Sequence, residues 1–206
     1  LERLAQPAGA DDPRNKEQRY LSMALFNKRG GLLGSSLEGV DREQLFRAIR
    51  AGLTNEDGRA RSSLATVYNN LSLEEIKPLL PAIYDAIVEP APSGIMFADG
   101  IQTSGLELFA QYHIDEGIEL LVDYGRNQKK HGSQKRIVTV MNLLKSYGAH
   151  AQRVIPQMEE MANYFENDEE GFPKKLSQEK AKVVRETIES IKASREKPKL
   201  ISLSPD

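Results

Sequence analysis

The same helical pattern of apolar residues recurs four times along this chain. In one copy, apolar residues occupy positions 79, 80, 83 and 87, a spacing that gathers side chains on one face of an α-helix. Equivalent positions, counted from Phe46 to Leu80, Ile118 and Ile155, are 34, 38 and 37 residues apart. Recurrence at this period is typical of stacked repeats, and here each repeat consists of two helices. The pattern therefore predicts an all-α protein.

A second set of amphipathic segments alternates with these four copies and supplies the partner helix of each pair. Helices of about 12 residues are marginal alone, so each pair needs its neighbours to cover its second apolar face. Caps are expected at Asp41, at Thr54 or Asn55, and at Ser72. Tyr68, Tyr112 and Tyr147 are expected to pack with their hydroxyls at the surface. The expected inner faces of three partner helices are Tyr20, Leu21, Ala24 and Leu25; Ala60, Leu64, Val67, Tyr68 and Leu71; and Ile137, Val140, Met141, Leu144 and Tyr147.

The two ends of the chain differ in pattern from the repeats. Residues 1–12 contain Pro7, Gly9 and small side chains and are predicted to be an N-terminal tail or linker. A last helix over Ser177–Glu196 has a narrow apolar stripe and charged residues elsewhere, as suits a helix that caps an array. Residues 197–206 are predicted to be a C-terminal tail, either an ordered strap across the last repeat or free. The intervening residues 13–196 are predicted to form a single domain.

Two motifs resemble the HEAT-repeat (armadillo-like) family. Residues 76–83 (Ile-Lys-Pro-Leu-Leu-Pro-Ala-Ile) resemble the second helix of a HEAT repeat, and residues 54–61 resemble the acidic turn that enters a first helix with arginine. The resemblance covers about residues 14–196. It implies a right-handed α-α superhelix of about four HEAT-like helical hairpins plus a C-terminal capping helix. The uneven period departs from a strict consensus.

Charge and composition exclude several classes of protein. The net charge is −2 and the isoelectric point is near 6.0, so we do not expect nucleic acid as a partner. The chain has no cysteine, which rules out disulfides and thiolate zinc sites. No apolar run approaches the roughly 20 residues that span a bilayer, so no membrane insertion is expected.

One basic cluster is the candidate partner-binding site. It lies between the third and fourth pairs, and an acidic group at residues 159–170 is expected at the opposite rim, so that the two could steer a partner. A solvated loop is the simpler interpretation. The three histidines lack the spacing of a metal site, no catalytic motif is present, and no cofactor is expected. The cluster consists of Arg126, Lys129, Lys130, His131, Lys135 and Arg136.

These observations favour a non-enzymatic module that mediates protein–protein or interdomain interaction. The alternative is a ligand- or nucleic-acid-binding module attached to an enzyme, which the basic cluster motivates. The whole chain also resembles segments that end large exported bacterial proteins, which implies a C-terminal part of a larger bacterial protein. Its partner would be another protein or neighbouring domains of the parent chain. The sequence leaves the oligomeric state open.

Overall fold

The computed structural model describes residues 1–6, 8, 11–27, 30–33, 36–128 and 132–203. In that part of the chain the regular elements are helices, joined by two isolated parallel bridges at Asp57–Ser93 and Ile114–Ile201. The protein is therefore all-α, as the recurring pattern predicted. In chain order the elements are α1 (Arg14–Phe26), α2 (Arg42–Leu53), α3 (Gly58–Leu64), η1 (Ala65–Asn70), α4 (Leu73–Ile76), η2 (Lys77–Leu79), α5 (Leu80–Val88), η3 (Ile95–Phe97), α6 (Ala98–Gln111), α7 (Gly117–Arg126), α8 (Ser133–Ser146), η4 (Gly148–Val154), α9 (Ile155–Asn163), η5 (Tyr164–Asp168) and α10 (Lys174–Ala193).

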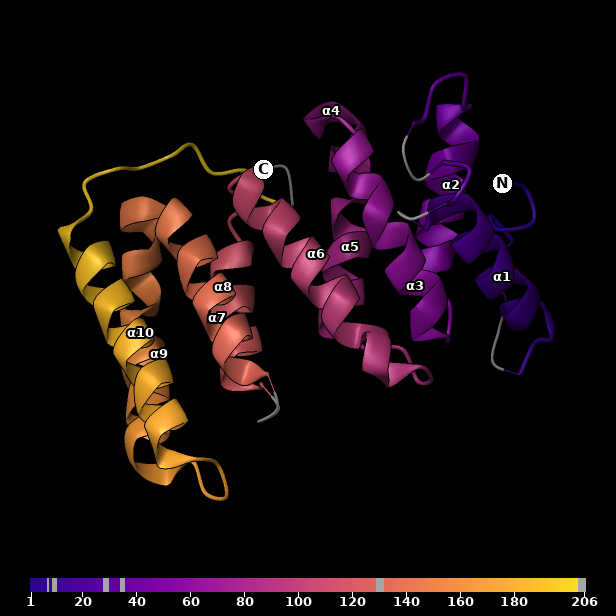
Figure 1. Ribbon diagram of the computed structural model, residues 1–206. Helices are drawn as coiled ribbons and strands as arrows, with labels where there is room; N and C mark the ends of the chain where they lie inside the picture. Colours follow the sequence, from indigo (N-terminus) through magenta and orange to yellow (C-terminus); the bar gives the residue numbers. More distant parts are fainter. Residues whose placement is uncertain (7, 9–10, 28–29, 34–35, 129–131, 204–206) are drawn as a thin grey trace. The chain divides into compact units, whose positions relative to one another are not determined.

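The chain divides into two units, Leu1–Leu108 (unit 1) and Phe109–Asp206 (unit 2). Within each unit, helices that are not consecutive in sequence pack against each other. In unit 1, α1 packs on α3, and α2 packs on α5. In unit 2, α8 packs on α10, and α7 packs on α9. Figure 1 shows α3 between α1 and α6, and α8 beside α10. The single domain over 13–196 stays a prediction.

Short polar side chains set the starts of three helices. The Asp41 carboxylate accepts a hydrogen bond from the Gln44 amide at 2.9 Å and caps α2. Ser72 and Glu75 form a reciprocal capping box at α4, as expected. The prediction that Thr54 or Asn55 caps α3 is wrong. Asp57 caps this helix instead, while the Asn55 side chain accepts a bond from the Asp57 amide.

The inner faces of the later partner helices are confirmed. In unit 1 the five residues expected around α3 and η1 are all buried, and so are the five expected along α8 and at its end in unit 2. The predicted hydroxyl positions were wrong for two tyrosines. The Tyr147 hydroxyl is buried and donates a hydrogen bond to the Ile114 carbonyl at 3.0 Å, and the Tyr68 hydroxyl is also enclosed.

The predicted inner face of α1 is wrong. Tyr20 and Ala24 are exposed, whereas Gln18, Ser22 and Phe26 are buried. Hydrogen bonds explain why this polar face is buried. The Gln18 side-chain amide donates to the carbonyls of Arg3 at 3.1 Å and Gln6 at 2.5 Å. Asn55 in turn donates to the Gln18 side-chain carbonyl at 3.2 Å. The N-terminal segment, whose Leu4 is buried, thereby contacts α1.

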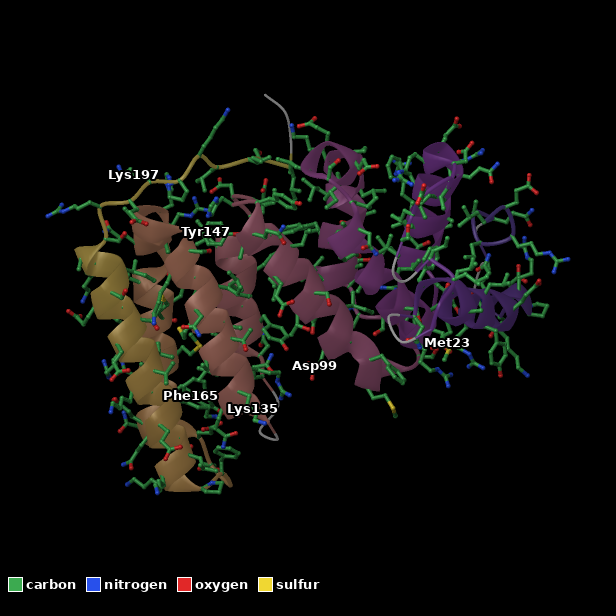
Figure 2. The ribbon with its side chains drawn as sticks, turned by 45° about the horizontal axis from the view of Figure 1, so that its top comes forward. Met23, Asp99, Lys135, Tyr147, Phe165 and Lys197 are labelled. Carbon is green, nitrogen blue, oxygen red and sulfur yellow. The ribbon has the colours of Figure 1, made fainter. Side chains whose placement is uncertain are left out.

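The C-terminal segment after α10 is an ordered strap in unit 2, one of the two arrangements expected. The amide of Ala149 donates to the Glu196 carbonyl at 2.8 Å. Further along, Ile201 accepts from the Asp115 amide at 2.8 Å and donates to the His113 carbonyl at 3.0 Å. Figure 2 shows Lys197, early in this strap, at the same end of unit 2 as Tyr147.

Candidate functional site

The predicted basic cluster lies at one end of unit 2. Arg126 is the last residue of α7, and Lys135 and Arg136 are in the first turn of α8. Lys129, Lys130 and His131 lie outside the described residues. Arg126 forms an ion pair with Glu160 at 3.3 Å, and the Arg136 guanidinium donates to the Gln128 side chain. Two of the three described members are therefore engaged with residues of unit 2, and Lys135 is exposed.

The acidic group is not at the opposite rim, so that part of the prediction was wrong. Arg126 at the end of α7 already contacts Glu160 near the end of α9. Ser133, the first residue of α8, and Glu169, after α9, both contact the Lys180 ammonium, so the chain after α9 returns to the level at which α8 begins. Figure 2 shows Lys135 and Phe165 together at this end of unit 2. One member of each set, Arg126 and Glu160, therefore forms an ion pair at this end of unit 2.

A buried ion pair closes the same end of unit 2. The Lys180 ammonium contacts Glu169 and donates to the Ser133 hydroxyl at 3.1 Å. The side chains of Lys180 and Glu169 are only 1% and 4% exposed. The ammonium also lies 4.3 Å and 4.4 Å from the ring centroids of Phe165 and Phe172, where the ring faces attract a cation. This site joins α8, the residues after α9, and α10.

Sequence reasoning missed this ion pair, although a signal was present. Lys180 falls four residues before Val184, directly on the apolar stripe of α10. A lysine on an otherwise apolar helix face is rarely fully buried without a partner. The nearby segment Phe165–Phe172 supplies the carboxylate and both aromatic rings. The contacts described for the ammonium all join it to side chains of unit 2. The ion pair is therefore suited to stabilising the fold and not to binding a ligand.

Unit 1 contains a second charged centre, at Asp57. Its carboxylate accepts from the Arg59 side chain at 2.7 Å and from Arg19 at 3.1 Å. Hydrogen bonds from Arg59 are the main cause that lowers the pKa of Asp57 to about 2, and burial opposes them. The buried Arg61 guanidinium, on the same helix as Arg59, donates to the carbonyls of Asn55 at 2.6 Å and Glu89 at 2.7 Å.

Exposed apolar side chains lie on the two elements, α1 and η3, that pack against the helix capped by Asp57. Tyr20 and Met23 come from α1, and Ile95, Met96 and Phe97 form η3; together we call them the apolar surface of unit 1. The Arg19 guanidinium lies 4.6 Å from the centroid of the Tyr20 ring. Helix α3, to which Arg59 belongs, packs against both α1 and η3. This surface was not expected, because Tyr20 was assigned to the core.

Metal, membrane and family comparisons add no further site. Among the described residues, no group of three or more histidine, aspartate or glutamate side chains could hold a metal ion, and no helix there is long and apolar enough to cross a membrane. No protein-family model matches the chain, and comparison with curated proteins and with solved structures gives no significant match. The fold therefore defines only a broad class, that of all-helical proteins.

Proposed function

We propose that the protein is a non-enzymatic HEAT-like repeat module that mediates protein–protein or interdomain interaction. The observation that supports this most is the packing of helices two steps apart in sequence, α1 on α3 in unit 1 and α8 on α10 in unit 2. Such packing is what a stack of helical pairs requires, because each pair covers the apolar face that its neighbour leaves open.

The proposed architecture is a right-handed α-α superhelix of about four hairpins with α10 as the cap. The pattern of α10 supports a capping role. Ala181, Val184, Ile188 and Ile191 are all buried, while the remaining faces carry charged residues such as Lys182 and Glu186. A helix of this kind covers the last apolar face and presents a polar side to water.

Repeat arrays bind partners over side chains drawn from several successive helices. The apolar surface of unit 1 has this character, because its residues come from α1 and η3 on either side of α3. Exposed apolar side chains with polar and charged residues beside them are typical of protein-binding surfaces. The partner would be another protein or neighbouring domains of a parent chain.

The proposal is tested by affinity capture with the immobilised protein, followed by reconstitution with purified candidates. We expect a protein that binds directly and saturably. The proposal would be contradicted if the protein stays monodisperse and if no captured protein binds it again when the two are purified and mixed. Saturable binding of duplex or single-stranded DNA with a steep salt dependence would favour the alternative, a nucleic-acid-binding module attached to an enzyme.

A further inference from the structure

We propose that the apolar surface of unit 1, with the guanidinium groups of Arg19 and Arg59, binds an acidic amphipathic helix of a protein partner. The inference rests on the proposed function and names the chemistry of the partner. Its starting point is the charge at Asp57, where two guanidinium groups share one carboxylate.

Two guanidinium groups share one carboxylate, so the three side chains together carry one net positive charge, and some guanidinium N–H groups have no acceptor among the described residues. Arg59 uses Nε and Nη2 on Asp57, and Arg19 uses Nη1. The hydrogen bonds described for the two residues leave Arg59 Nη1 and the other two nitrogens of Arg19 without an acceptor. The Arg59 side chain is 41% exposed and the Arg19 side chain 15% exposed, so Arg59 supplies the donor that a partner reaches, and Arg19 adds positive charge behind it. A second carboxylate, supplied by a partner, would complete this centre with charge-assisted hydrogen bonds.

The side chains around the centre are unusually exposed for their type. Met96 is 81% exposed, Ile95 59% and Tyr20 55%, and Met23 and Phe97 are each more than a third exposed. Burying them against a partner would remove apolar area from water, which is the main favourable term in association. Two of the five are methionines, whose flexible side chains adapt to different apolar partners.

The backbone holds η3 next to the charged centre. Ser93 donates to the Glu56 carbonyl at 3.0 Å and accepts from the Gly58 amide at 2.9 Å, so the chain before η3 is tied to the start of α3. Gly94 follows with φ +63°, and a Cβ atom there would lie 2.8 Å from the Asp57 carboxylate. The residues directly after Gly94 therefore emerge beside Asp57, with their position fixed by hydrogen bonds.

An amphipathic helix fits this arrangement better than other occupants. Its apolar residues at a spacing of three and four cover side chains on both sides of α3, and a flanking aspartate or glutamate reaches the guanidinium groups. A basic segment would be repelled by the excess positive charge. A free anion would satisfy the arginines but leave the apolar side chains in water.

The test is a display selection of random peptides about 15 residues long, enough for four helical turns, on the whole protein. We expect enriched peptides with leucine, phenylalanine or methionine at helical spacing and a net negative charge. Their affinity is then measured by fluorescence anisotropy for Met96→Asp and Met96→Lys. Met96 is so exposed that either change leaves the fold intact, which circular dichroism checks.

The two variants add charges of opposite sign at the same position. We expect Met96→Asp to weaken binding by about tenfold or more, because it opposes the acidic peptide, and Met96→Lys to retain or strengthen it. Arg59→Gln should weaken binding as Met96→Asp does. The matched controls are Val138→Asp and Val138→Lys on α8 in unit 2, where Val138 is 42% exposed; neither should change the affinity.

The inference would be overturned by enrichment of basic or uncharged peptides, by equal effects of Met96→Asp and Met96→Lys, or by displacement of the peptide by inorganic phosphate alone. Concentration-dependent self-association that Met96→Asp abolishes would also overturn it, because the occupant would then be a second copy. A purified partner that binds equally well to Met96→Asp and Arg59→Gln would leave the proposed function standing while this inference fails.

Discussion

Asp57 makes more interactions in unit 1 than the capping of one helix requires. Its carboxylate caps α3, pairs with Arg59 on the same helix and pairs with Arg19 on α1. The sequence motif around residues 54–61 pointed to an acidic turn, but not to which residue caps or which arginine comes from another helix. Such pairing depends on tertiary packing, because Arg19 is 38 residues away in the chain.

We expect Asp57→Asn to destabilise the protein by about 2 kcal/mol at pH 7, the free energy that corresponds to lowering the carboxyl pKa from 3.8 to about 2. Because the folded state lowers this pKa, the stabilisation is present above about pH 4 and is lost as the pH falls toward 2. Urea denaturation between pH 7 and pH 2 measures the difference. Asp85→Asn, an exposed change of the same charge on α5, should show no such loss; a gap for Asp57→Asn that is constant with pH would contradict the assignment.

We expect Lys180→Met to destabilise unit 2 by about 3–5 kcal/mol, because Glu169 would keep a buried charge without its partner. The double variant Lys180→Met/Glu169→Gln removes that charge and should recover a large part of the loss. Denaturant unfolding of both variants measures the difference. If the double variant is no more stable than Lys180→Met, the cost of the buried charge is not what the geometry indicates.

At the scale of helices, apolar periodicity predicted faces well where the core is apolar. The buried residues of α8, α10 and the α3–η1 region follow the expected stripes. It failed for α1, whose buried stripe of Gln18, Ser22 and Phe26 is largely polar and is set by hydrogen bonds to the N-terminal segment. Periodicity counts apolar side chains, so a face buried through amide hydrogen bonds is invisible to it.

The candidate site shows the same division. The basic cluster could be predicted because its charged residues lie close together in sequence. In the structure, two of its described members contact Glu160 and Gln128. The apolar surface of unit 1 escaped notice because its residues are some 70 positions apart, on α1 and η3. The hydrogen bonds between Ser93 and the start of α3 hold η3 beside that helix, and no local sequence pattern predicts them.

The strap of unit 2 depends on a close approach at Gly148. This glycine has φ +57°, and a Cβ atom there would lie 2.4 Å from the Glu196 carbonyl oxygen. We expect Gly148→Ala to destabilise the protein by about 1–2 kcal/mol or more and to speed amide exchange at Ala149, Asp115 and Ile201. Hydrogen exchange measured by NMR checks this.

Gly39→Ala is the matched control for the strap. Gly39 also has a positive φ, +72°, but a Cβ atom there would meet nothing within 4 Å. It should incur the backbone cost without changing exchange at the three strap-related amides. Equal exchange in Gly148→Ala and the unmodified protein would show that the strap tolerates the added methyl group.

For the molecule as a whole, the net charge of −2 and the local pairing of opposite charges in unit 2 lead to a prediction about nucleic acids. We expect no measurable retention of duplex DNA at about 150 mM salt, because phosphate binding depends on unpaired lysine and arginine side chains. Filter binding across a salt series measures this. A linear fall of log affinity with log salt, with a slope of several units, would contradict the prediction.

The bridge at Ile201 determines how unit 2 would respond to mechanical load. A pull on the chain at Leu203 loads the hydrogen bonds of Leu203 to the Glu116 carboxylate, and then the two backbone hydrogen bonds that Ile201 shares with the His113–Asp115 loop, before it reaches Glu196 or α10. Tension is thus delivered to the turn that leads into α7 while α10 stays shielded. The strap would peel away first, and the helices behind it would unravel only at higher force.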